Sequence, residues 1–198
     1  MRTRFITSAP HSQAFPDSDL PEVAFVGRSN VGKSSLLNKV AGAKIARTSK
    51  TPGRTQAVNF FEVSGKGFSF VLADLPGYGY AKAGRAARRA WYEVIEAYLE
   101  SRTQLKAVLL LIDIRRGVQP DDEEVYGWLG GEVGQNRDLL ILGTKADKLS
   151  KAKRKPVLHG IAADLGADRS STMLCSSLLG IGVEELRERL IELGGHQG

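Results

Sequence analysis

The sequence predicts an α/β fold, in which one mostly parallel β-sheet carries helices on both faces. Apolar runs of strand length alternate along the chain with segments whose apolar residues recur at helical spacing. This alternation is typical of parallel strands joined by crossover helices. A length of 198 residues fits one domain with a sizeable core. Hydrophobic residues make up 42% and charged residues 25% of the chain, which excludes the disordered and collagen-like classes.

Six strands are expected, one of them antiparallel to the rest. They are predicted over residues 23–26, 58–63, 68–73, 105–112, 139–142 and 172–175. The segment Ser64-Gly65-Lys66-Gly67 separates the second strand from the third and indicates a tight hairpin turn. Because a hairpin reverses the chain, one strand at the edge of the sheet should run against the others.

Helices should connect these strands, directly after Gly32 and over residues 85–101, 121–129, 151–165 and 183–193. In the second of these, the side chains that follow helical spacing and should face the core are Trp91, Val94, Ile95, Tyr98 and Leu99. We expect the first fifteen residues and residues 194–198 to be frayed. The domain division is then an N-terminal extension over residues 1–21, a domain over residues 22–193 and a C-terminal tail over residues 194–198.

Charge and cysteine content narrow the class of protein. Lys and Arg number 28 against 22 Asp and Glu, a formal charge of +6 that favours a polyanionic partner. Cys175 is the single cysteine, which excludes an intrachain disulfide and a cysteine-based zinc site, and the three histidines are too scattered for a metal cluster. The N-terminus has no apolar segment typical of a secretory signal, and the longest strongly apolar run, residues 107–112, is too short to cross a bilayer. We therefore expect a cytoplasmic protein without a membrane partner.

A phosphate-binding loop is predicted after the first strand. The segment Gly27-Arg28-Ser29-Asn30-Val31-Gly32-Lys33-Ser34 fits the pattern G-x-x-x-x-G-K-[ST] and lies between a predicted strand and a predicted helix. Its glycines allow backbone amides to wrap a phosphate group, and the helix N-terminus favours negative charge. Lys33 should reach the β- and γ-phosphates, and Ser34 can ligate Mg²⁺.

A second element of the site is expected where a later strand ends in a carboxylate. Asp74-Leu75-Pro76-Gly77 follows an apolar strand. Asp74 can hold Mg²⁺ there through a water molecule, while the Gly77 amide senses a γ-phosphate. A polar strand end followed by a Pro-Gly turn is the simpler structural alternative. The position of this segment, about forty residues after the phosphate-binding loop, favours the functional interpretation.

The fifth predicted strand runs into Thr144-Lys145-Ala146-Asp147, which indicates guanine as the base. The Asp147 carboxylate can accept hydrogen bonds from N1–H and the exocyclic amine of guanine, groups that adenine does not offer. At ~1.5–3 kcal/mol per charge-assisted bond, the pair separates the two bases by ~10²–10⁴-fold. Lys145 should pack its stem over the base and tie down the phosphate-binding loop. After the last strand, a backbone amide of Cys175-Ser176-Ser177 could meet the guanine O6.

The polar stretch over residues 48–56 should form a nucleotide-sensing loop. A hydroxyl in this stretch could complete the Mg²⁺ shell only when a γ-phosphate is present, which would make the loop a switch. Thr48, Thr51 and Thr55 all qualify on chemistry, and the residues alone do not choose among them.

Taken in this order, the motifs resemble those of the bacterial EngB family (also called YihA or YsxC), within the Era-, EngA- and TrmE-like group of translation-factor-class GTPases. The resemblance rests on residues 27–35, 51–56, 74–81 and 144–149 and spans about residues 22–193. It implies a single P-loop GTPase (G) domain that binds GTP and GDP and hydrolyses GTP. It also implies that Thr55 is the switch threonine and that Ser34, Thr55 and, through water, Asp74 hold Mg²⁺.

Motifs and resemblance together define the expected nucleotide contacts. These are Gly27, Arg28, Ser29, Asn30, Val31, Gly32, Lys33, Ser34, Ser35, Gly53, Arg54, Thr55, Gln56, Ala57, Asp74, Leu75, Pro76, Gly77, Thr144, Lys145, Ala146, Asp147, Cys175, Ser176 and Ser177. Relatives often carry an aromatic or aliphatic residue at the position of Cys175, which leaves its contact open. A small apolar residue at a buried strand end is the alternative reading of this cysteine.

By the same resemblance, the chain is a molecular switch in assembly of the large ribosomal subunit and is needed for normal cell division and septation. The expected partner is the large subunit or its rRNA and not DNA, and a monomer is the default state. A GTP-dependent scaffold of the division apparatus without a direct ribosome role is the alternative. A metabolic P-loop kinase is disfavoured by Asp147, by the threonine-containing loop and by the lack of an acceptor-binding lid.

Hydrolysis should be slow, because Tyr78 stands where many regulatory GTPases place a glutamine that orients the attacking water. A phenol does this poorly, so an external contribution from a cation or a ribosomal partner is expected. Asn30 resembles a potassium-coordinating residue of TrmE-like GTPases, which makes K⁺ a candidate cofactor; an ordinary asparagine in a tight loop is the alternative. The catalytic residue stays open, with Lys33, Thr55 and Asn30 as candidates.

Basic residues gather beside both predicted switch segments. Lys44, Arg47, Lys50 and Arg54 surround the first, and Arg85, Arg88 and Arg89 share one helical face after the second. We expect these groups to form an RNA-facing surface whose shape depends on GTP. Lys151, Lys153, Arg154 and Lys155 are interpreted instead as a solvated helix start.

Overall fold

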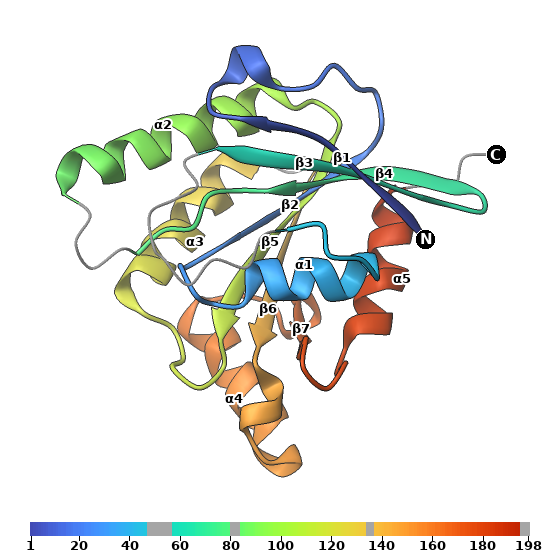
Figure 1. Ribbon diagram of the computed structural model, residues 1–198. Helices are drawn as coiled ribbons and strands as arrows, with labels where there is room; N and C mark the ends of the chain where they lie inside the picture. Colours follow the sequence, from blue (N-terminus) through green and yellow to red (C-terminus); the bar gives the residue numbers. More distant parts are fainter. Residues whose placement is uncertain (47–56, 80–83, 134–136, 195–198) are drawn as a thin grey trace.

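A computed structural model describes residues 1–46, 57–79, 84–133 and 137–194 of the chain (Figure 1). Seven strands form one sheet in the order β1-β3-β4-β2-β5-β6-β7. The strands are β1 (Arg2–Ala9), β2 (Glu22–Gly27), β3 (Val58–Gly65), β4 (Phe68–Asp74), β5 (Leu105–Asp113), β6 (Asp138–Thr144) and β7 (Thr172–Leu174). The helices are α1 (Lys33–Ala41), α2 (Arg85–Ser101), α3 (Pro120–Val133), α4 (Lys151–Asp164) and α5 (Val183–Gly194), with short 3-10 turns η1 (Ser12–Ala14), η2 (Ala146–Lys148) and η3 (Arg169–Ser171).

The sheet carries helices on both faces, as the sequence predicts. Helices α2, α3 and α4 contribute to one apolar core, and α1 and α5 contribute to the other. Alternate residues of β2 point to opposite sides, with Ala24 and Val26 in the first core and Val23 and Phe25 in the second. The buried strands therefore read as continuous apolar runs, because both of their faces are covered.

The predicted core stripe of α2 is confirmed. Ile95, Tyr98 and Leu99 are buried, and Trp91 and Val94 pack against the same core while partly exposed. The helix itself has the predicted bounds. Among the described helices, none has both the length and the apolar character that crossing a membrane requires.

The expectation of frayed N-terminal residues is wrong, because residues 2–9 form β1. This strand pairs antiparallel with β3, so the sheet has seven strands where six were expected, and β3 is not at the edge. Only β3 runs against the other strands, as the hairpin predicts. The pattern missed β1 because it buries little: Ala9 is buried, whereas Phe5 is 54% exposed. The strand is identified instead by its pairing with β3, whose partner residues lie 49 (Ala9 and Val58) to 62 (Arg2 and Ser64) positions later in the chain.

The expectation that Gly194 belongs to a frayed tail is also wrong. It is the last residue of α5 and is buried, and an added Cβ would lie 2.8 Å from Cδ1 of Phe70. Glycine thus allows the helix end to approach the ring of Phe70 closely. The rest of the predicted tail, residues 195–198, lies outside the described residues.

The five parallel strands β4, β2, β5, β6 and β7 place their carboxyl ends along one edge of the sheet. The motif residues follow these strand ends: residues 28–32 after β2, Leu75 to Gly77 after β4, and Lys145 to Asp147 after β6. In open α/β sheets, ligands bind at this edge.

Candidate nucleotide-binding site

The phosphate-binding loop connects β2 to α1 in a tight conformation. Gly32, which precedes the helix, has φ 107°, and Asn30 has φ 65°, so both occupy the left-handed region. Gly32 makes no side-chain cap, which leaves amides in the first turn of α1 available to a ligand. An anion at this helix end would meet N–H groups and the positive end of the helix dipole.

Lys33 and Asp74 meet at this loop and form an ion pair. Their side chains are 12% and 9% exposed, so the pair is largely removed from solvent. The pair brings the predicted phosphate ligand beside the predicted Mg²⁺ carboxylate from a different strand. A carboxylate, the nearby hydroxyl-bearing Ser34 and phosphate oxygens form an oxygen donor set that suits Mg²⁺. The residues present thus fit a magnesium ion bound together with a nucleotide phosphate.

Two residues at the carboxyl end of β6, Thr144 and Lys145, reach back to the phosphate-binding loop. Oγ1 of Thr144 lies 2.8 Å from the carbonyl oxygen of Val31, and Nζ of Lys145 donates to the carbonyl oxygen of Asn30 over 2.7 Å. The structure therefore joins the base-side motif to the phosphate side, as the sequence predicts for Lys145. Lys145 itself has φ 58°, an unusual conformation for a residue with a long side chain.

Asp113 is a site residue that the sequence analysis missed. It ends β5 and accepts a 2.9 Å hydrogen bond from Nζ of Lys145, and Arg115 donates to both of its carboxylate oxygens over 2.9 and 2.6 Å. Burial alone would raise its pKa, but these hydrogen bonds outweigh burial and lower the pKa to about 2. Asp113 thereby fixes the ammonium group of Lys145. The sequence did carry a signal for Asp113, because it is a carboxylate at the end of a predicted strand, beside two predicted loops.

The predicted base-binding carboxylate is held by a neighbouring loop. Oγ of Ser176 donates to Oδ1 of Asp147 over 2.6 Å and accepts a 3.1 Å hydrogen bond from the amide of Leu179. The hydrogen bond from Ser176 lowers the pKa of Asp147, so this carboxylate stays charged. The sequence predicted only a backbone role for residues 175–177, whereas the Ser176 side chain orients Asp147.

Cys175 does not present its thiol to this site. The residue is fully buried within the apolar core beneath α1 and α5, and burial raises the pKa of its thiol to about 12. Its carbonyl oxygen accepts a 3.1 Å hydrogen bond from the amide of Ala146. The expected contact of Cys175 therefore reduces to a backbone role, and the alternative of a small buried residue is the better account of its side chain.

Arg154 also belongs to the support of this site, and its interpretation as part of a solvated helix start is wrong. From the first turns of α4, its Nε donates to the carbonyl oxygens of Ala146 and Leu149 over 2.9 and 3.1 Å. These carbonyls flank Asp147, so the arginine holds the ends of its loop. Lys151, Lys153 and Lys155 are exposed, as expected.

The side chain of Tyr78 packs against α2 and is hydrogen-bonded to α3. The ring is 6% exposed, and its hydroxyl donates to Oδ1 of Asp122 in α3 over 2.7 Å. Arg28 likewise points to α3, where it pairs with Asp121 over 2.7 Å. A cavity of about 190 Å³ lies beside residues 28–31 and is also lined by Asp122 and Lys145.

The predicted first switch segment, residues 48–56, lies outside the described residues. Gly53, Arg54, Thr55 and Gln56, together with Thr48 and Thr51, lie outside the described residues, as do Arg47 and Lys50. Ala57 is described and lies directly before β3. The other predicted nucleotide contacts lie at the carboxyl ends of the parallel strands, on the loops that follow these strands, or at helix starts.

The sequence matches known proteins over most of its length. A family model described as "50S ribosome-binding GTPase" matches residues 22–145. A protein named "Probable GTP-binding protein EngB" from Trichlorobacter lovleyi is 46% identical over 178 residues, which cover 89% of this chain and 88% of that protein. The protein of the same name from Myxococcus xanthus is 41% identical over 197 residues, with 97% and 94% of the two chains covered.

Solved structures share the fold. A crystal structure of a probable GTP-binding protein EngB superposes with a TM-score of 0.68 at 24% identity, covering 87% of this chain and 97% of that one. Era in complex with MgGDPNP and nucleotides 1506–1542 of 16S ribosomal RNA gives a TM-score of 0.71 at 26% identity, covering 90% of this chain and 58% of Era. Both similarities extend over most of this chain.

Proposed function

The chain belongs to the EngB family of GTP-binding proteins, and from that premise we propose that it is a GTPase switch acting in assembly of the large ribosomal subunit. GTP binding and hydrolysis follow from the family. The observation that carries the site assignment is the convergence of Lys33, Asp74, Lys145 and Asp147 from separate segments onto one edge of the sheet. The description of the family model supports a role on the large subunit, and the likeness to Era, solved with a segment of 16S ribosomal RNA, supports contact with rRNA.

The phosphate end of the site supplies positive charge and backbone donors. On binding GTP, Lys33 would exchange Asp74 for β- and γ-phosphate oxygens, and the first turn of α1 would bind phosphate through its amides. Ser34, Thr55 and, through water, Asp74 would hold Mg²⁺, which when bound adds positive charge at the phosphate oxygens. Asp147 would accept the two guanine donors at the other end.

Intrinsic hydrolysis should be slow, because the hydroxyl of Tyr78 is committed to Asp122 and does not orient a water. We expect positive charge from outside the chain to accelerate hydrolysis, either K⁺ at Asn30 or a group of the ribosome. Single-turnover hydrolysis in K⁺ and in Na⁺ at equal ionic strength, with and without large subunits, distinguishes the two. Equal rates in the two salts would exclude the potassium role.

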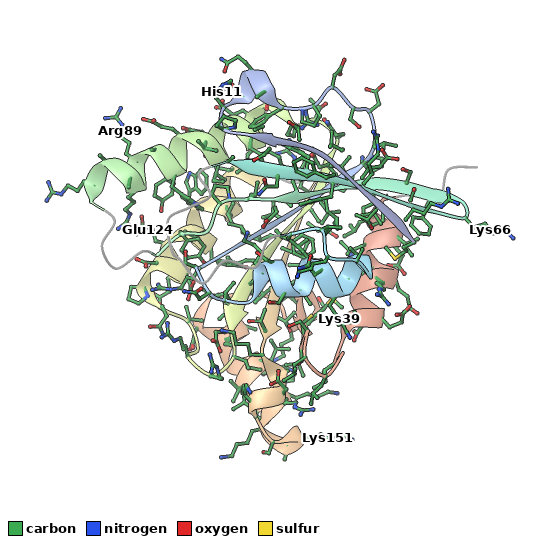
Figure 2. The ribbon with its side chains drawn as sticks, in the orientation of Figure 1. His11, Lys39, Lys66, Arg89, Glu124 and Lys151 are labelled. Carbon is green, nitrogen blue, oxygen red and sulfur yellow. The ribbon has the colours of Figure 1, made fainter. Side chains whose placement is uncertain are left out.

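Two basic surfaces are candidates for contact with rRNA. On α2, Arg88 pairs with Glu124 and Arg89 with Glu93, but all four side chains are about half exposed or more, so these pairs stabilise little and can exchange for phosphate. On α4, Lys151, Lys153 and Lys155 make no ion pair within the described part of the chain. Figure 2 shows Arg89 and Lys151 far apart on the molecule. We assign the α2 surface to RNA because it adjoins the segment after Asp74, which responds to nucleotide.

Co-sedimentation with purified large subunits tests this proposal. We expect binding with a non-hydrolysable GTP analogue, weaker binding with GDP, and a steep fall in affinity with salt. Arg85, Arg88 and Arg89 changed together to Glu should abolish binding, whereas the matched reversal of Lys151, Lys153 and Lys155 should not. Circular dichroism checks that each triple variant is folded.

The alternative is a GTP-dependent scaffold of the division apparatus without a ribosome role. It predicts no co-sedimentation in either nucleotide state, with GTP hydrolysis intact. Loss of binding only in the α4 variant would keep the ribosomal role and move the RNA contact to the other surface.

A further inference from the structure

The segment after Asp74 is fastened to the phosphate-binding loop through its backbone. The amide of Tyr78 donates to the carbonyl oxygen of Gly27 over 3.3 Å, and the amide of Ser29 donates to the carbonyl oxygen of Tyr78 over 2.9 Å. Gly77 lies against the same loop, since an added Cβ would be 3.1 Å from Oγ of Ser29. The position of the Gly77 amide, which should sense a γ-phosphate, therefore depends on how Pro76 and Tyr78 are held.

Both neighbours of Gly77 are held by hydrogen bonds that involve side chains of α2 and α3. Nε1 of Trp91 in α2 donates to the carbonyl oxygen of Pro76 over 2.7 Å. The hydroxyl of Tyr78 donates to Asp122 over 2.7 Å, and its ring lies edge-on to Trp91 with 5.5 Å between centroids. Burial, together with the nearby Asp122 carboxylate, raises the pKa of the Tyr78 phenol, so it remains a hydrogen-bond donor.

Asp122 is built to hold this hydroxyl. It is 2% exposed, and its second oxygen accepts a 3.0 Å hydrogen bond from the amide of Gln119, so each carboxylate oxygen has a partner. Since the carboxylate caps the start of α3, it cannot turn away without unpairing that amide. The carboxylate is thus a rigid acceptor fixed to the helix.

The preceding residue, Asp121, holds the phosphate-binding loop in the same way. It accepts a 2.7 Å hydrogen bond from Arg28, and the Arg28 guanidinium lies on Gly79, where an added Cβ would be 2.9 Å from Cζ. Gly79 has φ 73°. Asp121 and Asp122, consecutive residues of α3, therefore hold the phosphate-binding loop and the segment after Asp74, respectively.

We propose that Asp122 is a positioning residue for GTP hydrolysis, which holds the Gly77 amide at the γ-phosphate through Tyr78 without touching the nucleotide. This rests on the proposed role of Gly77. Because GDP has no γ-phosphate, the bond between Tyr78 and Asp122 affects GTP and not GDP. This role of Tyr78 accounts for its burial, since a side chain exposed to orient water could not make the hydrogen bond to Asp122.

Tyr78→Phe in the full chain is the direct test, because it removes the hydroxyl and keeps the ring on Trp91. We expect the single-turnover rate and the affinity for a non-hydrolysable GTP analogue to fall about ten-fold each, as for loss of one hydrogen bond to a charged group. GDP affinity should stay within about two-fold on the same reasoning. Asp122→Ala, which removes the acceptor of this hydroxyl, should act alike, and the double variant should be no worse than either single one. Tyr92→Phe is the matched control, because its hydroxyl bonds Glu124 in the same aromatic cluster but not the segment beside Gly77.

Tryptophan fluorescence gives a second readout. The chain has two tryptophans, Trp91 and Trp128, whose rings lie 6.1 Å apart in this cluster. The analogue should change the emission of the unaltered chain more than GDP does, and Tyr78→Phe should remove the difference.

Equal losses for GTP analogue and GDP in Tyr78→Phe, or a hydrolysis rate within two-fold of the unaltered chain, would overturn the proposal and leave a structural role. Failure of the Gly77 assignment itself is distinguishable, since the unaltered chain would then show no fluorescence difference between the two nucleotides. The ribosomal role is not involved in either measurement.

Discussion

The two ends of the candidate nucleotide site differ in how their charged groups are paired. At the guanine end, each charged group has a fixed partner that does not compete with the base: Asp147 is held by Ser176, and Lys145 by Asp113. At the phosphate end, Lys33 and Asp74 pair with each other. We therefore expect a nucleotide to enter a preorganised base pocket and its phosphates to displace the ion pair of Lys33 and Asp74. Specificity should therefore depend on rigid contacts, and the response to phosphate on exchange of partners.

The largest expected effect is at the guanine end. Asp147→Asn replaces an acceptor by a group that donates, so GTP affinity should fall by ~10²–10⁴-fold while xanthosine triphosphate binds better than before. Competition binding with both nucleotides measures this. Asp164→Asn, an exposed change on α4, is the control. If ATP bound the unaltered chain as tightly as GTP, the guanine assignment would be wrong.

The phosphate end should respond with a different signature. Lys33→Ala removes the charge that meets the β- and γ-phosphates, and GTP and GDP affinity should fall by about 100-fold, with no gain for any other base. Lys39→Ala, on an exposed position of the same helix, should leave affinity unchanged. A calorimetric titration provides both values. A loss restricted to GTP would mean that Lys33 contacts only the γ-phosphate.

Asp113 offers a test through stability and pH. The folded pKa of Asp113, about 2, lies below the ordinary aspartate pKa of 3.8, so the charged carboxylate stabilises the fold at pH values above 3.8. The contribution, about 2 kcal/mol, should be complete near neutral pH and disappear as the pH falls from about 4 towards 2. Urea unfolding of Asp113→Asn and the unaltered chain should therefore differ at pH 7 and converge on acidification. A difference that grew at low pH would contradict the assigned direction.

The smallest effect is expected at Ser176. Ser176→Ala removes one hydrogen bond to the Asp147 carboxylate and should lower GTP affinity by about ten-fold. Because that bond lowers the pKa of Asp147, the variant should lose GTP on acidification at a higher pH than the unaltered chain. Ser150→Ala, an exposed neighbour before α4, is the control for both measurements.

Much of the site could be predicted because its motifs are local. The spacing from Gly27 to Ser34 and the order of the later motifs identified the loops at the strand ends, and the helical period of α2 predicted its bounds. What stayed out of reach were partners far apart in the chain. Arg154 belongs to a basic run that looks solvated, and its contact with Ala146 is visible only once α4 packs beside the loop.

The same limit explains the errors in the fold. An edge strand such as β1 has one covered side, and its alternation of buried and exposed residues is weak, so only pairing with β3 identifies it. Gly194 looked like part of a flexible tail because glycine is usually read as a break, whereas its missing side chain is what lets α5 approach Phe70.

The fold class and the segments expected to meet the nucleotide could be predicted from the sequence, because hydrophobic period and motif spacing are properties of neighbouring residues. Only the tertiary structure shows which carboxylate holds which donor: Asp113 the ammonium group of Lys145, Asp121 the guanidinium of Arg28 and Asp122 the hydroxyl of Tyr78. These partners come from different strands and helices. Their pairing depends on the order of strands in the sheet and on the cost of leaving a buried charge without a partner, and no local pattern records either.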